Sequence, residues 1–302
     1  MPMVAPMMPN ISDNIRGAFL MMGSMAAFTL NDACMKALSD ELPLSQALFL
    51  RGLATTALMY LLARSLGVLN LAMSPRDRWL VRLRNVMEIG TAYFFITALF
   101  NMPLANASAI MQALPLSVTL AGALFLGQAV GWRRLIAILI GFTGVMLIVR
   151  PGMAGFNVYS LYVLVAVVLV TIRDILARKI SASVPTMTVA LMNALSVTIA
   201  FGLASIFTDW APLSGKATLQ LGGASIFIIG GYVFSVSAMR AGEIAVIAPF
   251  RYTSLLWALV LGLVVFSDWP DQITLLGSAI VVATGVYTFY RERRISQENA
   301  GG

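Results

Sequence analysis

Long apolar runs alternate with short polar segments along the whole chain. A helix needs about 20 mostly apolar residues to cross the hydrocarbon core of a bilayer, and these runs reach that length. The connections are short, as in Asn-Met-Pro at 101–103 and Ala-Gly at 241–242. We therefore predict an all-α polytopic membrane protein with ten transmembrane helices. They are expected at 15–37, 44–66, 79–100, 103–126, 132–150, 157–179, 185–207, 219–240, 243–266 and 272–290.

Composition agrees with this pattern. Of the 302 residues, 59% are hydrophobic and 11% are charged, whereas a soluble domain has about 45–50% and about 25%. The net charge of +7 comes from Arg and Lys residues between the apolar runs, where membrane proteins place them for topology. We therefore expect the lipid bilayer as a partner, and no nucleic acid.

The basic residues are distributed unevenly between the two sides that the predicted spans define. One side keeps Lys36, Arg150 and Lys216, and the positive-inside rule makes it the outer side. This predicts cytoplasmic tails at 1–14 and 291–302 and a place in the bacterial inner (plasma) membrane. No basic segment precedes Arg16, so we expect the first run to be retained and not cleaved. The cytoplasmic side collects Arg16, Arg64, Arg76, Arg78, Arg82, Arg84, Arg133, Arg134, Arg178, Lys179, Arg240, Arg291, Arg293 and Arg294.

The segment 29–43 recurs at 171–185, at a constant offset of 142 positions. Each half, 15–150 and 157–290, then holds five predicted spans. Because five is odd, the second half enters the membrane from the opposite side. This predicts an inverted 5+5 repeat with a substrate site near the midplane, although apolar helices also match by chance. The aligned pairs are Thr29 with Thr171, Asp32 with Asp174, Lys36 with Arg178, Ser39 with Ser181 and Pro43 with Pro185, followed at an offset of 140 by Gly122 with Gly262 and Leu135 with Leu275.

Two repeated charge pairs stand near the ends of the predicted first and sixth spans. Asp32 and Lys36 are four residues apart, as are Asp174 and Arg178, so each pair shares one helix face and can form an ion pair. Inversion places one pair near each mouth of the protein. Either they are structural ion pairs, or together with Arg173 they are gates or sites of proton or exchange coupling.

These features resemble the EamA branch of the drug/metabolite transporter superfamily. The resemblance covers about 15–290 and includes "PLANASAIMQALPLSVTLAGALFLG" at 103–127 and "GFTGVMLIVRPG" at 141–152. In this family an acidic residue commonly follows the Leu-Gly that ends the fourth span. Here that position is Gln128, while the second half has Asp268. The resemblance implies a secondary transporter that works by alternating access.

Shorter segments resemble particular members of the branch. "NDACMK" at 31–36, "RDILARK" at 173–179 and "APFRYTSLLWA" at 248–258 are similar to bacterial S-adenosylmethionine uptake transporters. Riboflavin importers of the same branch are also similar. This implies an amphipathic or charged organic metabolite as the substrate. Exporters of amino acids and related metabolites share the fold and are the alternative.

Two charged residues lie deep in predicted spans without a partner on their own helix. Arg251 lies eight residues past Glu243, or about 12 Å along the helix, and Glu88 is comparably deep in the third span. They form either an interhelical salt bridge that only holds the bundle together or the polar centre of a substrate site. Arg51 is expected to brace a peripheral contact. The other candidate substrate-binding residues are Tyr93, Gln112, Tyr232, Tyr252 and Trp257.

Backbone signals accompany these side chains. Pro115 lies near the middle of the fourth predicted span, where its missing N–H predicts a kink or hinge. The eighth predicted span contains Gly222, Gly223, Gly230 and Gly231, which permit either close helix packing or a flexible gate.

The sequence contains no His and a single Cys, Cys34. Without His there is no Ser–His dyad and no His-rich zinc motif. We therefore expect neither an intramembrane enzyme nor a metal or other cofactor. A channel is a further alternative, but no filter-like Gly loop stands out. Oligomeric state is not indicated.

Overall fold

The computed structural model describes residues 11–67, 72–127, 131–153, 156–181, 183–241 and 244–300, and within them it contains helices and connections but no strand. Gln128 and Glu243 lie outside these residues, as does most of the predicted N-terminal tail. The helices are α1 (Ile11–Lys36), α2 (Leu44–Ser65), α3 (Pro75–Asn101), α4 (Leu104–Met111), α5 (Leu114–Leu126), α6 (Trp132–Val149), α7 (Tyr159–Lys179), α8 (Thr186–Ser205), α9 (Gly215–Ala241), α10 (Ile244–Ile247), the 3-10 helix η1 (Ala248–Tyr252), α11 (Thr253–Phe266) and α12 (Gln272–Ala300).

Nine segments of the described chain are long and apolar enough to cross a membrane. The predicted span at 79–100 falls in α3 and is not among them. α3 has 27 residues, which is sufficient length, but its first half carries several charges. The prediction of an all-helical, multi-pass membrane protein is therefore confirmed. α12 continues to Ala300, so the tail predicted at 291–302 is helical over most of its length.

Two of the predicted spans are interrupted near a proline. α4 ends at Met111 and α5 begins at Leu114, one residue before Pro115. The ninth predicted span is divided into α10, η1 and α11, with Pro249 inside η1. Proline has no N–H to donate to the preceding turn, and its ring collides with the carbonyl four residues earlier. The break predicted at Pro115 is present, and a second break lies at Pro249.

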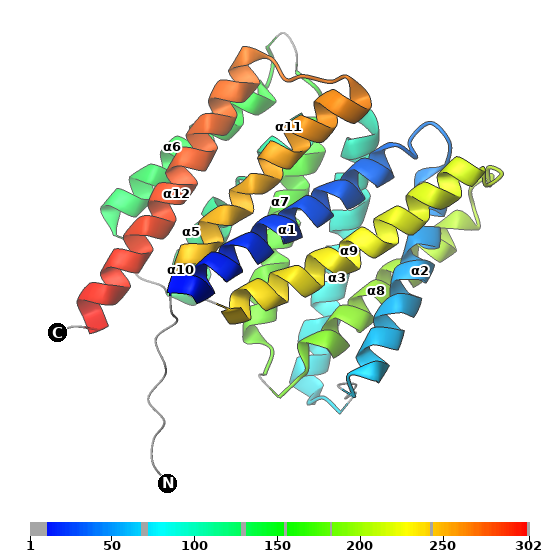
Figure 1. The fold of residues 1–302 in the computed structure, drawn as a ribbon, viewed down its shortest axis with the longest axis horizontal. Helices are drawn as coiled ribbons and strands as arrows, with labels where there is room; N and C mark the ends of the chain where they lie inside the picture. The colour runs from blue at the N-terminus through cyan, green and yellow to red at the C-terminus, as the bar shows by residue number, and fades with distance from the viewer. Residues whose placement is uncertain are drawn as a thin grey trace.

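The helices pack in long side-by-side pairs. α1 lies along α9, α3 along α7, α6 along α12 and α2 along α8 (Figure 1). Small residues allow the close approaches: Ser24 on α1 donates a hydrogen bond of 2.7 Å to the carbonyl of Gly231 on α9. A Cβ atom built on Gly231 would lie 2.6 Å from the ring of Phe28. Of the four glycines singled out in the sequence, Gly223 and Gly231 therefore lie against neighbouring side chains, while Gly222 and Gly230 face open space.

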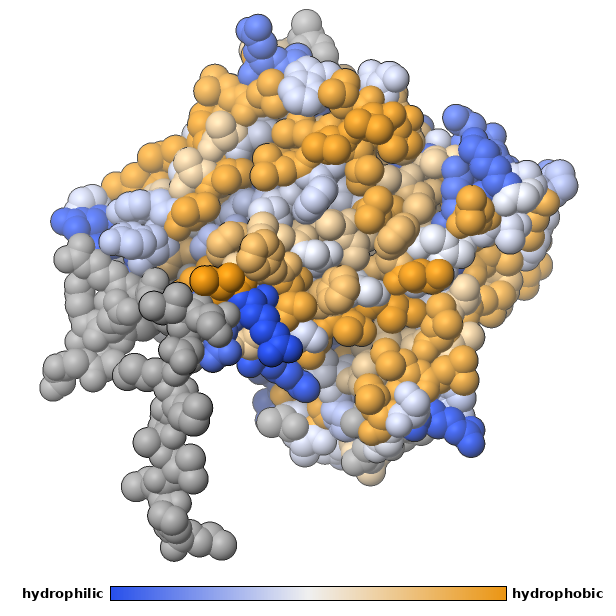
Figure 2. Space-filling model, in the orientation of Figure 1, coloured by the Kyte–Doolittle hydropathy of each residue, from blue (hydrophilic) through white to orange (hydrophobic). Residues whose placement is uncertain are grey.

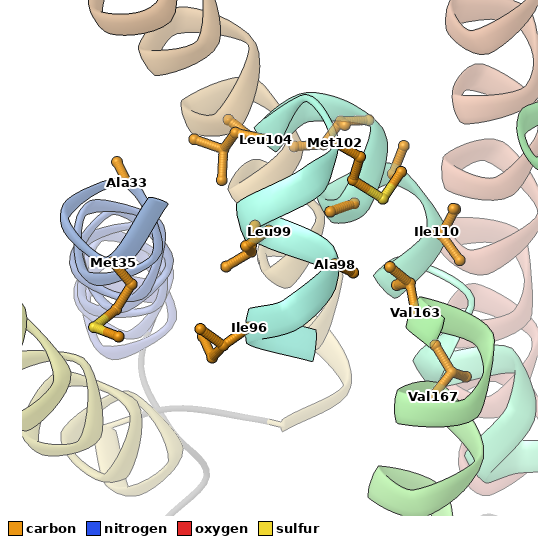
Figure 3. Close-up of a cluster of buried hydrophobic side chains, with 14 of the residues drawn as sticks. Ala33, Met35, Ile96, Ala98, Leu99, Met102, Leu104, Ile110, Val163 and Val167 are labelled. Carbon is orange, nitrogen blue, oxygen red and sulfur yellow. The ribbon is translucent and has the colours of Figure 1, made fainter. Parts of the chain in front are cut away.

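A large cluster of buried apolar side chains joins the first helices of the chain to α7. Figure 3 shows Leu99 on α3 between α1 and the turn that leads into α4, and Val163 and Val167 on the neighbouring α7. The outer surface is also apolar over most of the face in Figure 2, with charged residues gathered toward its edges. This distribution is expected when the bundle is surrounded by lipid and not by water.

Two carboxylates fasten the opposite ends of the bundle, and we call these contacts the Glu41 latch and the Asp77 latch. In the Glu41 latch, Glu41 accepts a hydrogen bond of 2.6 Å from Ser214 at the start of α9 and pairs with Lys216 at 3.0 Å. In the Asp77 latch, Asp77 of α3 accepts bonds from the backbone N–H and the hydroxyl of Ser181, each of 3.0 Å, and one of 2.8 Å from Ser74. Each latch joins a loop between two helices to the start of a distant helix.

The crossing of α6 and α12 gives a prediction about packing. A Cβ atom on Gly144 would lie 2.8 Å from the carbonyl oxygen of Gly277, which is backbone and cannot move aside. We expect Gly144→Ala to lower the free energy of unfolding by about 1–3 kcal/mol, the usual cost of overpacking. The measurement is the thermal unfolding midpoint in detergent. Gly222→Ala, which adds the same methyl group in open space, is the control. Equal midpoints for both variants would contradict the close contact.

The Asp77 latch gives a prediction about pH. The backbone N–H of Ser181, followed by the Ser74 hydroxyl, holds the pKa of Asp77 below its ordinary value, against a smaller opposing effect of burial. A lowered pKa means that the latch adds stability above the ordinary Asp pKa of about 3.9 and loses it as the pH falls through the folded-state pKa. We therefore expect the unfolding midpoints of the wild type and Asp77→Asn to differ by a constant amount from pH 5 to 8. That difference should shrink below about pH 4. A difference that grows on acidification would refute this account.

Candidate functional site

A column of polar side chains extends through the bundle. At a rise of 1.5 Å per residue, Asp32 lies about 6 Å from the end of α1 and Arg51 about 10 Å from the start of α2. Both are nearer the end that holds the Glu41 latch. Glu88 lies at the midpoint of α3. We define the polar column as Asp32, Arg51, Tyr232, Glu88, Arg173, Asp174 and Arg251.

The middle of the column is a three-residue ion network. Arg173 on α7 donates a hydrogen bond of 2.7 Å to Glu88 on α3 and one of 2.9 Å to the neighbouring Asp174. The side chains of Arg173 and Glu88 are 20% and 16% exposed. Asn193 on α8 also interacts with Glu88. The partner of Glu88 is therefore Arg173 and not Arg251, and Asp174 pairs with Arg173 and not with Arg178, which is exposed.

The end of the column nearer the Glu41 latch is built on α1 and α2. Arg51 donates a hydrogen bond of 3.3 Å to the side-chain oxygen of Asn31, whose amide donates one of 2.9 Å to Asp32. The electrostatic neighbours of Arg51 include Asp32, Tyr232 and Glu88, so this end connects with the middle. Arg51 is therefore part of the polar centre, and the prediction that it braces a peripheral contact is wrong.

Lys36 has a different role from the predicted pairing with Asp32. Its ammonium group donates hydrogen bonds of 2.8 Å and 3.3 Å to the carbonyls of Met102 and Leu99, at the C-terminal end of α3. It also lies 5.3 Å from the ring centre of Phe266. These carbonyls have no donor within α3 because they belong to its last turn. Lys36 thus caps one helix and connects α1 to it.

Arg251 projects from the interrupted ninth span. Its electrostatic neighbours are Asp174, Arg173 and Tyr252, and its side chain is half-buried. The backbone around it is fixed by Gln112, which donates a hydrogen bond of 2.6 Å to Ser254, whose hydroxyl in turn donates to the carbonyl of Arg251. Gln112 is therefore a link between the two helix breaks.

Tyr232 on α9 completes the middle of the column. Its electrostatic neighbours are Glu88, Arg173, Arg84 and Arg51. Its ring packs edge-to-face against Phe28, with the ring centres 5.4 Å apart. The phenol can donate a hydrogen bond to a carboxylate or to a ligand, and the ring is held by the α1–α9 contact.

Two of the predicted aromatic residues, Tyr93 and Trp257, lie away from the column, and Tyr252, although it neighbours Arg251, packs its ring against α12. Tyr93 is 44% exposed and lies about 140° around α3 from Glu88 at 3.6 residues per turn. Tyr252 is buried against Gly285 and Phe289 of α12. Trp257 is 40% exposed on α11. Their roles in binding stay predictions, and the proposed site is built without them.

Two arginines, Arg51 in the polar column and Arg84 beside it, were not proposed as site residues from the sequence. Arg51 has a detectable signal, because the 142-position offset pairs Arg51 with Asn193 and Asn31 with Arg173. In the first half the arginine is on the second predicted span and the asparagine on the first, and in the second half the two residue types are the other way round. Arg84 gave no such signal, since it counts toward the basic cytoplasmic side. Two nitrogen atoms of its guanidinium group are buried and have no hydrogen-bond partner in the described part of the chain.

Two grooves lie elsewhere and are almost entirely apolar. One, of about 490 Å³, lies between α6 and α12 beside Trp132 and Tyr287. The other, of about 570 Å³, lies between α2 and α8 beside Phe49 and Trp210. Their linings contain few groups that could orient a charged ligand, so the polar column is the better candidate site. The described residues contain no group of three or more His, Cys, Asp or Glu side chains that could hold a metal ion.

Comparison with known proteins places the chain in a family. The model of the EamA-like transporter family matches twice, over residues 15–150 and 157–290. A relative from Pseudomonas aeruginosa (strain UCBPP-PA14), the pseudopaline exporter CntI, is 28% identical over 275 residues, which cover 88% of this chain and 93% of the exporter. The riboflavin transporter of Vibrio cholerae is 24% identical, covering 78% of each chain.

Further comparisons agree. The S-adenosylmethionine uptake transporter of Rickettsia prowazekii is 24% identical over 195 residues, which cover 64% of this chain and 65% of the transporter. One solved crystal structure shares the fold with a TM-score of 0.64 at 20% identity, covering 94% of this chain and 98% of the other. The family resemblance recognised in the sequence is thus confirmed: this chain belongs to the EamA-like transporter family and is a multi-pass membrane transporter.

Proposed function

We propose that this protein is a secondary transporter that moves a small amphipathic or charged organic metabolite along the polar column by alternating access. The observation that carries the proposal is the column itself, because ionisable residues within a bilayer are costly and usually mark a transport path. The column draws its residues from both halves of the chain, and Glu88, Arg173, Arg251 and Tyr232 form its substrate-binding part.

Ten spans in an inverted 5+5 repeat are part of this proposal, with the repeats at 15–150 and 157–290. The double match of the family model supports it. So do two contacts between positions 142 apart, the offset seen in the sequence: Thr56 bonds Thr198 at 3.0 Å, and Gln112 bonds Ser254. Positions related by a two-fold axis meet each other only near that axis, so both contacts fit an axis through the bundle.

Helix packing supports the same symmetry. If the halves exchange places, the α1–α9 contact corresponds to the α7–α3 contact, and the α2–α8 and α6–α12 contacts correspond to themselves. Ser74 and Ser214 both cap the start of a helix and are 140 positions apart. The two latches are therefore equivalent elements at opposite ends, as two gates of an alternating-access carrier would be.

We propose the inner membrane as the location, with both termini cytoplasmic. The start of α1 and the end of α12 lie at the same end of the bundle (Figure 1), and most of the basic residues belong to that end. The test places a single cysteine at position 216 or 240 in a protein whose own Cys34 is replaced by Ser. Cells that express each variant are then treated with a thiol reagent that cannot cross the membrane. We expect labelling at position 216 from outside and at position 240 only after the membrane is opened. The reverse pattern would invert the topology.

The names of the relatives suggest several substrate classes and both directions of transport. Uptake of an S-adenosylmethionine-like or riboflavin-like metabolite is the first candidate, supported by a relative named as an S-adenosylmethionine uptake transporter and another named as a riboflavin transporter. Export is the second candidate, favoured by the pseudopaline exporter, which matches more of this chain. Asp32, at the end of the column nearer the Glu41 latch, and Asp174, in the ion network at its middle, are the proposed positions for proton or exchange coupling.

Proteoliposomes test the function directly. Purified protein is screened for ligands by thermal shift, since a ligand of the folded state raises its stability. We expect labelled ligand to enter preloaded vesicles by saturable counterflow, and Asp174→Asn to abolish accumulation driven by an imposed gradient. Flux that rises linearly with concentration and shows no counterflow would identify a channel. Full accumulation by Asp174→Asn would remove that carboxylate from coupling.

A further inference from the structure

The charges around the polar column do not balance. Four guanidinium groups stand here, those of Arg51, Arg84, Arg173 and Arg251, beside the carboxylates of Asp32, Glu88 and Asp174. Arginine stays protonated under all ordinary conditions. When every carboxylate is ionised, one positive charge remains uncompensated, and a charge held in a low-dielectric interior without a partner is costly.

The three carboxylates are also distributed unequally among the four arginines. Arg173 alone pairs with two of the three carboxylates, Glu88 and Asp174. Arg51 donates to an amide oxygen, that of Asn31, and has Asp32 as its nearest opposite charge. Two buried nitrogen atoms of the Arg84 guanidinium have no hydrogen-bond partner among the described residues. The side chain of Arg251 forms no direct hydrogen bond or ion pair there either. Their carboxylate neighbours, Glu88 and Asp174, act on them electrostatically and are already bonded to Arg173.

The unpaired groups lie in the same part of the bundle. Measured along their helices from the end that holds the Asp77 latch, Arg84 is about 14 Å deep, Arg251 about 12 Å and Arg173 about 9 Å. The three guanidinium groups therefore lie at comparable depth, and the Arg173 network connects them: Arg173 and Asp174 are electrostatic neighbours of Arg251, and Glu88 is one of Arg84. Ser254, close to the helix break at Pro249, donates a hydrogen bond to the carbonyl of Arg251 and holds that backbone in place.

We propose that the transported metabolite is an organic anion whose carboxylate is bound by Arg251, with Arg84 supplying the second unpaired positive charge of the binding region. This rests on the proposed transport function and names its substrate class. A guanidinium presents two parallel N–H donors that match the two oxygens of a carboxylate. The bound carboxylate would neutralise the excess charge, so the loaded site is less costly in the membrane than the empty one.

Matched ligands test the proposal on the purified full chain in detergent. The probes are dicarboxylates, with succinate and glutarate as the simplest, each compared with its uncharged diamide, and with inorganic phosphate and anionic phospholipid. We expect carboxylates to raise the unfolding midpoint and their amides to leave it unchanged. Arg251→Gln should weaken carboxylate binding by about tenfold or more, the loss of a charge-assisted hydrogen bond. Arg251→Lys should retain part of the affinity, because it keeps the charge without the fork.

Controls separate the outcomes. Arg240→Gln removes an exposed charge at the same end and should leave the response unchanged, and sodium chloride at equal ionic strength should not reproduce it. Equal midpoints with acid and amide, or an unchanged response in Arg251→Gln, would overturn the proposal. A rise in the unfolding midpoint with phospholipid or phosphate alone would show that the unpaired arginines bind lipid or phosphate. That result would also overturn the proposal. Carboxylate binding without counterflow would leave this inference intact and refute the proposed transport function. Counterflow of only neutral or cationic ligands would support transport and refute the carboxylate site.

Discussion

Arg173→Gln is expected to destabilise the protein more than Glu88→Gln. Removal of Arg173 leaves two carboxylates, Glu88 and Asp174, without their guanidinium partner. Removal of Glu88 leaves Arg173 still paired with Asp174. Breaking a buried ion pair costs about 3–5 kcal/mol, and the partial exposure of these side chains places the loss for Arg173→Gln near the lower value.

The double variant Glu88→Gln/Arg173→Gln separates stability from function. It removes both charges, so we expect it to be more stable than Arg173→Gln alone and to reach the membrane, but to have lost transport. The measurement is a double-mutant cycle of unfolding midpoints in detergent, together with uptake in proteoliposomes. Lys179→Gln, an exposed change on the same helix, should alter the free energy of unfolding by no more than about 0.5 kcal/mol. Strictly additive effects of the two substitutions would show that Glu88 and Arg173 do not act as a pair.

Covalent closure of either latch is expected to abolish transport. In a Cys34→Ser background, Glu41→Cys/Ser214→Cys would connect the α1–α2 loop to the start of α9. Asp77→Cys/Ser181→Cys would connect α3 to the α7–α8 loop. An alternating-access carrier must open each end in turn, so one permanently closed end stops the cycle.

Oxidation and reduction of the same sample provide the control. Counterflow should disappear when either cysteine pair is oxidised and return when a reducing agent is added. The four single-cysteine variants should be unaffected by oxidation. Full counterflow in a sample in which mass spectrometry shows complete cross-linking would mean that the latched end need not open.

The sequence predicted the helices well because the relevant signals are local. Apolar runs of membrane-spanning length and short connections determine where the helices lie, and Pro115 marks the break between α4 and α5. The helix α3 was recognisable from its length and position although its charges lower its hydropathy. The extension of α12 to Ala300 was missed because a helix can continue beyond the membrane on polar residues.

The pairing of charges was less predictable, since it depends on how each helix is rotated about its axis. Helices that are apolar on every side give no periodic signal for that rotation. Spacing of four residues suggested Asp174 with Arg178, but Arg173 reaches both its neighbour and Glu88 on another helix. Lys36 was assigned to Asp32 for the same reason, whereas the unpaired carbonyls at the end of α3 are its partners. The partners of these charged side chains can therefore be read only from the packed helices.

The central claim is that the polar column is a path that opens to each side in turn. The most direct measurement is the labelling of Asn193→Cys, in a Cys34→Ser background, by an impermeant thiol reagent applied to one side at a time. Asn193 is buried and interacts with Glu88, so a rigid bundle would protect it from both sides. We predict labelling from either side, and slower labelling in the presence of transported ligand. A cysteine at position 193 that reacts from neither side, or from one side only whatever the ligand, would contradict the account.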